Sequence, residues 1–120
     1  MKGIILPNVS DVCTGECDFS INSVVEESTT KILQVLFELE HCDGKQFYLL
    51  QEYNMDFSNE DFYNLMYLSH VPTSGKPIVV DTEALVLCGG TCDVVLDEQG
   101  KAKVDMKTIS FSATIAAEVE

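Results

Sequence analysis

The chain contains no arginine, and all seven of its basic residues are lysines. It also has only two histidines, so general acid–base catalysis and phosphoryl transfer have few candidate groups. The sequence lacks the motifs of nucleophilic hydrolases, P-loop proteins, zinc proteases and dinucleotide-binding enzymes. We therefore expect a protein that is not an enzyme and that needs no cofactor.

Long hydrophobic runs are absent as well. No apolar stretch approaches the roughly 20 residues that a helix needs to cross a membrane. The N-terminal stretch 1–6 is too short for the apolar core of a signal peptide, and Pro7 and Asn8 interrupt it. These absences predict a cytoplasmic protein without a membrane partner.

Acidic residues dominate the charge. The formal net charge is −13, with three lysines against eleven acidic residues in positions 1–60 and four against nine in positions 61–120. Negative charge spread in this way repels nucleic acid over a Debye length of ~8–10 Å and favours basic protein partners. In the alternative interpretation, the acidic surface only keeps the protein soluble. With 120 residues, 46% of them apolar, the chain can form one domain with its own core.

Five cysteines cannot all pair in disulfides, so reduced cytosolic thiols are the simpler expectation. Four of them form two C-x-x-x-C pairs, Cys13 with Cys17 and Cys88 with Cys92. Four thiolates can hold a tetrahedral zinc ion, and zinc sites use this spacing. However, Cys17 and Cys92 both begin predicted strands that pair antiparallel, which would keep them apart. We expect buried or idle thiols, with zinc binding or a disulfide as weaker alternatives.

Two strand signals surround a tight turn in the first half of the chain. Asp43 and Gly44 suit the positive φ angles of a hairpin, and Lys45–Tyr53 is predicted to be its second strand, with an inward face that the pattern leaves open. A weaker strand signal, Asp18–Val25, precedes this hairpin. In the first hairpin strand, Lys31–Glu40, four apolar residues share one face at period two: Leu33, Val35, Phe37 and Leu39.

The segment Phe57–Leu68 is predicted to be a helix. Ser58 is the expected N-cap, and Asp61 is the acidic partner of a short capping box. Phe57 and Phe62 occupy the positions of a hydrophobic staple. Helical spacing places Phe62, Leu65 and Met66 on the apolar side of this helix. By the same spacing, Tyr63 and Tyr67 are expected to flank the core.

A second hairpin is predicted near the C-terminus. Cys92–Asp97 and Ala102–Phe111 alternate apolar and polar residues around a turn at Gln99 and Gly100. Upstream of this hairpin, Asp81 is expected to cap a short helical turn. That turn is expected to end at Gly89–Gly90.

The resulting order of elements, β-β-β-α-β-β, predicts a mainly β fold. It is the order of a five-stranded OB-like barrel with one helix between strands 3 and 4. The expected domain covers residues 1–120, with an irregular N-terminal segment at 1–16 and a short acidic tail at 112–120. A fold of this kind does not by itself give a function.

Two sets of side chains could contact nucleic acid. Aromatic rings on barrel strands stack bases in single-strand binders, and the candidates here are Tyr48, Tyr53 and Phe111. The only net-basic stretch carries three further candidates, Lys101, Lys103 and Lys107, of which the last two share a face with Asp105 at period two. Lys31 and Lys45 are expected to extend this surface. In the alternative interpretation, the rings belong to the core and the lysines are ordinary surface charge.

Three segments within residues 16–111 carry a recurring layout of strand, Asp-Gly hairpin, helix and Gly-turn hairpin. They are KILQVLFELEHCDGKQFYLLQEY, SNEDFYNLMYLSH and VDTEALVLCGGTCDVVLDEQGKAKVDMKTISF. This layout resembles a group of small phage and prophage single-stranded DNA-binding proteins. The resemblance implies an OB-type fold and non-catalytic binding of single-stranded DNA, in replication or recombination, in the cytoplasm of a bacterial host.

Two other functions remain open. An acidic surface could imitate nucleic acid and inhibit a basic nucleic-acid-binding host protein, as anti-defence proteins do. A structural or assembly module is the third hypothesis, and self-association stays open in all three. A continuous lysine and aromatic groove would favour DNA, and a continuous acidic stripe would favour a basic partner. The carboxylates considered for the stripe are Glu26, Glu27, Glu38, Glu40 and Glu52, of which Glu38 and Glu40 share the outer face of their strand.

Overall fold

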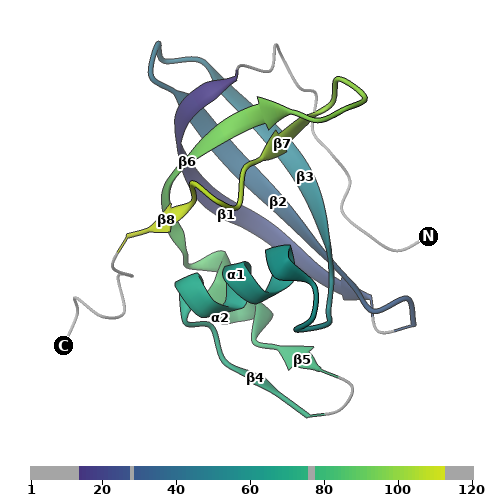
Figure 1. Ribbon diagram of the computed structural model, residues 1–120. Coiled ribbons are helices and arrows are strands. Elements are labelled where there is room, and N and C mark those ends of the chain that lie inside the picture. The colour runs from purple at the N-terminus through teal and green to yellow at the C-terminus, as the bar shows by residue number, and fades with distance from the viewer. Residues whose placement is uncertain (1–13, 28, 76–77, 113–120) are drawn as a thin grey trace, which may run out of the picture.

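The computed structural model describes residues 14–27, 29–75 and 78–112. Within these ranges it contains eight strands and two helices (Figure 1). The strands are β1 (Gly15–Glu27), β2 (Ile32–His41), β3 (Gln46–Asn54), β4 (Thr73–Ser74), β5 (Val79–Val80), β6 (Gly89–Leu96), β7 (Ala102–Val104) and β8 (Ser110–Phe111). The helices are α1 (Glu60–Ser69) and α2 (Thr82–Val86). None of the helices found in these ranges is long and apolar enough to cross a membrane.

The fold is mainly β, as the sequence predicts. Six strands form one antiparallel sheet in the order β3-β2-β1-β6-β7, with β8 also paired to β6, while β4 and β5 form a separate small hairpin. The strand pairing is open, because no ladder in the described ranges joins β3 to β7. A side chain connects these two strands instead, since the Val104 backbone N–H donates to Gln51 Oε1 at 3.1 Å.

Strand β1 is longer than the sequence indicates. The predicted strand Asp18–Val25 extends from Gly15 to Glu27, so Gly15 and Glu16 are not part of an irregular segment. Its pairing with β2 shifts register between Ile21 and Ser23. A β-bulge of this kind moves the following residues out of phase, which explains why the alternation in the sequence is blurred.

The hairpin of β2 and β3 follows the prediction closely. His41 and Lys45 close the turn through a 2.8 Å backbone hydrogen bond, and Gly44 has a φ of +96°. The predicted apolar face of β2 is buried, and the register with β3 fixes the inward face that the sequence leaves open. That inward face consists of Phe47, Leu49 and Tyr53, all buried in the core.

Helix α1 begins one residue later than expected from a Ser58 N-cap. The N-cap is Asn59, whose Oδ1 accepts a 3.0 Å hydrogen bond from the Phe62 backbone N–H. Ser58 instead donates its hydroxyl to Asp56 at 2.9 Å, so it cannot form a capping box with Asp61. The helix ends at Ser69, and its C-cap, His70, has a φ of +60°. The predicted contact between Phe57 and Phe62 is present, with ring centroids 5.2 Å apart, and the buried side is Phe62, Leu65, Met66 and Ser69.

Gly89 and Gly90 do not end the short helix α2. Asp81 caps this helix as predicted, through a 3.1 Å bond from the Ala84 backbone, but its C-cap is Leu87. The two glycines open β6, where β1 and β8 flank them. A Cβ at Gly90 would lie 1.9 Å from the Ser110 carbonyl oxygen, so β8 can approach β6 only because Gly90 has no side chain.

The predicted last strand, Ala102–Phe111, is divided in two. β7 ends at Val104, a turn follows over 106–108, and β8 pairs with a different part of β6. Hydrogen bonds to the Asp105 carbonyl oxygen from Thr108 N and Thr108 Oγ1, at 3.0 and 2.9 Å, hold this turn. Period-two alternation therefore does not extend from Lys103 to Lys107.

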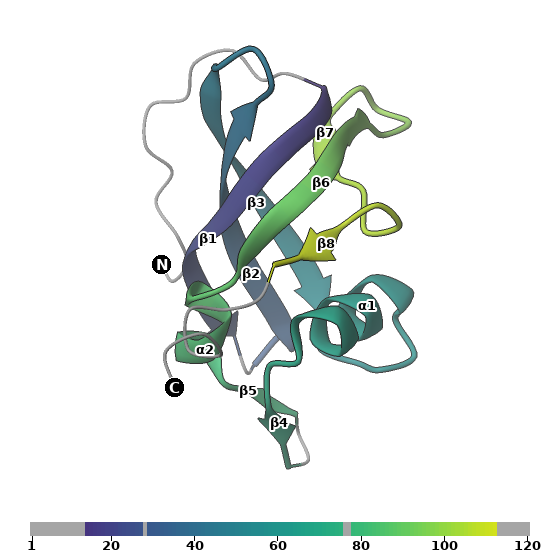
Figure 2. The ribbon, with the colours of Figure 1, turned by 90° about the vertical axis from the view of Figure 1, so that its left-hand side faces the viewer.

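The antiparallel register defines the two ends of the sheet. Gly15 lies opposite Val94 and Cys17 lies opposite His41, so the β2–β3 and β6–β7 hairpins share one end, the upper end in Figure 1. Helices α1 and α2 and the β4–β5 hairpin lie at the other end, as Figures 1 and 2 both show. Lys31, in the turn between β1 and β2, belongs to this lower end and does not extend the surface of the β6–β7 hairpin.

Candidate nucleic-acid interface

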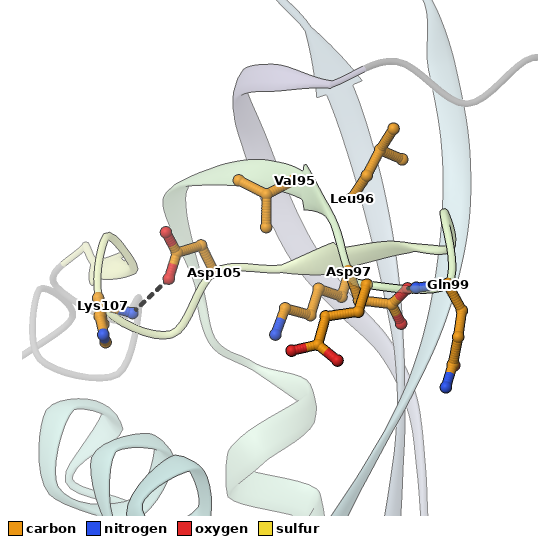
Figure 3. Close-up of a pocket in the computed structure, with 8 residues that line it drawn as sticks. Val95, Leu96, Asp97, Gln99, Asp105 and Lys107 are labelled. Atoms are coloured by element: carbon orange, nitrogen blue, oxygen red, sulfur yellow. Dashed lines mark hydrogen bonds between the residues drawn. The ribbon is translucent and has the colours of Figure 1, made fainter.

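The β6–β7 hairpin and the turn after β7 line an open groove of about 520 Å³ (Figure 3). Two of the three candidate lysines, Lys103 and Lys107, line it, and Lys101 lies in the adjoining turn. All three lysines are exposed. The rest of the lining comes from the same hairpin and from the turn after β7: Val95, Leu96, Asp97, Glu98, Gln99 and Asp105.

Asp97 holds the turn of this hairpin in place. Its Oδ1 accepts hydrogen bonds from the backbone N–H groups of Gln99 and Lys101, at 2.8 and 2.9 Å. The bond from Lys101 is the main reason why the pKa of Asp97 lies below its usual value. Gly100 follows with a φ of +82°, and its N–H donates to the Asp97 carbonyl oxygen at 3.0 Å. The turn predicted at Gln99 and Gly100 is therefore confirmed, and it fixes the backbone that carries Lys101.

Lys107 is positioned by the turn that ends β7. Its backbone N–H donates to Asp105 Oδ1 at 3.0 Å, the bond drawn in Figure 3. Thr108 Oγ1 in turn accepts a 3.0 Å bond from the Asp93 backbone on β6. The Lys107 side chain thus extends from a turn that is anchored to the sheet, close to the lysine on β7.

The groove carries mixed charge. Two ammonium groups face three carboxylates, those of Asp97, Glu98 and Asp105. Two of these carboxylates already use one oxygen to accept backbone N–H bonds within their own turns. In the part of the chain that the structure describes, no lysine ammonium lies within 4.0 Å of a carboxylate oxygen. The lysines therefore remain available to an anionic ligand, although the groove as a whole is not basic.

The three aromatic candidates differ in their exposure. Tyr48 is half-buried on the outer side of β3, opposite Glu38 in register. Phe111 is half-buried, and its ring meets Phe19 edge-on at a centroid distance of 5.4 Å. Part of the Phe111 ring is therefore committed to packing against the core, whereas Tyr48 is half-buried on the outer side of its strand.

Tyr53 is wrong as a stacking residue. Its side chain is only 4% exposed, and its hydroxyl donates to Met106 Sδ at 3.3 Å inside the core. Burial also raises the pKa of its hydroxyl well above the usual value. A base cannot reach this ring, because β3 turns it inward with Phe47 and Leu49.

The cysteines are arranged differently from the expectation. Cys17 lies directly opposite Cys92 in the β1–β6 ladder, so the strand-start argument that separated them is wrong: β1 begins earlier and the strands overlap at these residues. Burial raises the pKa of the Cys92 thiol to about 12 and also raises that of Cys88, which disfavours the thiolates that zinc requires. Cys13 lies outside the described residues. Within those residues, no three His, Cys, Asp or Glu side chains are grouped as metal ligands.

A second surface becomes visible only through the strand register. Asp18 lies opposite Glu40, and Glu16 lies opposite Asp93. Directly paired residues point to the same side of a sheet, and Glu38 follows Glu40 at period two. We call these five residues the acidic face; none of the partners that the ladders give them is a lysine. A groove of about 190 Å³ between Asp18, Glu38 and Glu40 lies on this face.

The sequence assigned two members of the acidic face, Glu38 and Glu40, but not the other three. The missing signal is the pairing of β1 with both β2 and β6, which no local pattern reveals. Two further carboxylate candidates are engaged in hydrogen bonds of their own: Glu26 Oε2 accepts a 2.9 Å bond from the Val80 backbone, and Glu52 accepts a 2.9 Å bond from Gln34.

No protein-family model, curated protein or solved structure matches the chain.

Proposed function

We propose that this chain is a non-catalytic single-stranded DNA-binding protein with an OB-type arrangement of strands. The first three strands, α1 and then the β6–β7 pair follow the element order of that fold. The sheet order β3-β2-β1-β6-β7, with Gln51 bridging the two outer strands, supports an incompletely closed barrel.

The observation that carries the proposal is the grouping of Lys101, Lys103 and Lys107 around one hairpin. All three are exposed, and none lies in an ion pair within the described residues. Lysines of this kind contact phosphates without reading sequence, so the expected binding is non-specific. Lys45, at the same end of the sheet, lies in the neighbouring hairpin and supplies a further cation.

The overall charge sets the expected strength of this binding. A net charge of −13 opposes the approach of DNA, and the three groove carboxylates weaken the local field. We therefore expect a dissociation constant in the non-specific range, about 10⁻⁴–10⁻⁶ M. Contacts should be limited to the hairpin end of the molecule, where Asp93 of the acidic face lies two residues before Val95, the register partner of Lys103.

A fluorescently labelled oligo-dT strand provides the test. We expect its anisotropy to rise with protein concentration at low salt, and the variant with Lys101, Lys103 and Lys107 all changed to Gln should lose this binding. The matched control is Lys31→Gln, because Lys31 lies at the opposite end of the sheet. This variant should bind oligo-dT as the unaltered protein does. Absence of binding at about 50 μM protein, within the non-specific range, would rule out the proposal.

The acidic face supports a second candidate function. Five carboxylates on adjoining strands could meet a basic protein surface in place of nucleic acid. For this role, a variant with Glu38 and Glu40 both changed to Lys must lose binding to a basic nucleic-acid-binding protein while its circular dichroism spectrum stays the same. Retained binding by a folded variant would exclude the acidic face.

A further inference from the structure

One side of helix α1 presents tyrosines to solvent. Tyr63 and Tyr67 are 47% and 61% exposed, although their spacing had suggested that they flank the core. Glu60 shares this side, because residues three and four positions apart on a helix are neighbours. The opposite side packs into the core through Phe62 and Leu65, so the position of the helix is fixed and the tyrosines point outward.

The two tyrosine rings have a defined mutual orientation. Their centroids are 5.8 Å apart and their planes differ by only 9°. His70, at the C-cap, places a third ring 6.5 Å from Tyr67. Parallel rings held in this way form a ready surface for a flat partner, and little side-chain freedom is lost on contact.

The segment that carries these rings is negatively charged, although Lys31, from the turn between β1 and β2, lies close enough to Asp56 to help lower the pKa of its carboxyl group. Between residues 46 and 75 the chain contains no lysine, while it carries four carboxylates, those of Glu52, Asp56, Glu60 and Asp61. A hydrogen bond from the Ser58 backbone keeps the pKa of Asp56 below its usual value, so this group stays ionised. Tyrosine π-faces next to carboxylates attract a cation, and a guanidinium group adds planar stacking to that attraction.

The exposed tyrosine rings and the carboxylates near them together discriminate between the ligands that could bind this side of α1. Phosphates of a nucleic acid would be repelled by the carboxylates. A second copy of the chain carries the same excess of negative charge and has no arginine to offer. A basic segment of another protein satisfies both the rings and the charge.

We propose that the outward side of α1, formed by Glu60, Tyr63 and Tyr67, binds an arginine-bearing segment of a partner protein. The site lies at the end of the sheet opposite the β6–β7 hairpin (Figure 1).

The test is a titration with an Arg-Gly-Gly repeat peptide, followed by the NMR signals of the tyrosine rings and of the backbone amides. A Lys-Gly-Gly peptide of the same length is the matched ligand. We expect the arginine peptide to shift the signals of Glu60, Tyr63 and Tyr67 and to bind more tightly than the lysine peptide. Changing Tyr67 to Ser should weaken this binding about fivefold, the fold-change that about 1 kcal/mol of cation–π attraction produces.

The control variant is Leu87→Ser, since Leu87 is equally accessible at 59% exposure but lies after α2. It should bind the arginine peptide as the unaltered chain does. Equal affinity for the two peptides, or shifts spread over the acidic face with none at α1, would overturn the proposal. So would shifts at α1 that appear with oligo-dT or with rising protein concentration alone, because they would identify nucleic acid or a second copy as the occupant.

Discussion

The close approach of β8 to β6 makes Gly90 highly sensitive to a small substitution. An alanine Cβ at this position would lie 1.9 Å from the Ser110 carbonyl oxygen and 2.9 Å from Phe111 Cα. Both obstacles are backbone atoms, so no side-chain rotation relieves the contact. We expect Gly90→Ala to force β8 away from β6.

The cost of that displacement follows from the contacts that β8 makes. The edge-on contact between Phe19 and Phe111 contributes about 1 kcal/mol, and the 2.8 Å hydrogen bond from Ser112 N to Gly89 O contributes about as much. Residual overpacking adds a cost within its usual range of about 1–3 kcal/mol. We therefore expect the free energy of unfolding to fall by about 3–5 kcal/mol, and the melting temperature to fall by about 10–20 °C.

Urea denaturation followed by circular dichroism measures this change. The control is Gly100→Ala, where a Cβ meets no atom within 4 Å and only the φ of +82° is unfavourable; it should cost about 1 kcal/mol. An NMR spectrum should also show the Phe111 amide signal displaced in Gly90→Ala. Equal stability of the two variants would refute the reasoning, because it would mean that β8 does not lie against Gly90.

Four further outcomes are expected. Asn59→Ala should lower the free energy of unfolding by about 1 kcal/mol because it removes the N-cap of α1, whereas Ser58→Ala should change it far less; the reverse order in urea titrations would contradict the cap assignment. Tyr53→Ala should cost about 3–5 kcal/mol by leaving a cavity in the core, and a small loss would mean that the ring is not buried. In iodoacetamide labelling at pH 8, resolved by peptide mass spectrometry, the exposed Cys42 should react quickly and Cys92 slowly, because Cys92 is buried and its pKa is raised to about 12. The neutral Cys92 thiol favours folding below its ordinary pKa of 9.0, and this stabilisation should be lost as the pH rises from there toward 12; unchanged stability over that window would contradict the assignment.

The parts of the fold that depend on nearby residues could be predicted from the sequence. The alternation in β2, the Asp43-Gly44 turn and the Asp81 cap each involve groups within a few residues of one another, and all are present. The N-cap of α1 was misplaced by one residue because Ser58 and Asn59 are both good caps. The structure selects Asn59, since Asp56 binds the Ser58 hydroxyl.

The features that depend on distant residues could not be predicted. The bulge in β1, the pairing of Cys17 with Cys92 and the placement of β8 against Gly90 are all set by strand register. The same limit applies to the candidate sites. The period-two pattern of β2 placed Glu38 and Glu40 on one face correctly. Only the strand register adds Glu16, Asp18 and Asp93 to the acidic face. Tyr53 was wrongly included among the stacking candidates because its strand carries apolar and aromatic residues on both faces, which left the inward face open.

The dependence of oligo-dT affinity on salt concentration tests the proposed DNA contact most directly. If Lys101, Lys103 and Lys107 each neutralise one phosphate, the logarithm of the association constant should fall with the logarithm of salt concentration at a slope of about −2. Changing Lys103 alone to Gln should make the slope less steep by about 0.7, while Lys31→Gln should leave it unchanged. A slope that is the same in Lys103→Gln and in the unaltered chain would contradict the assignment of the β6–β7 hairpin as the DNA-binding site.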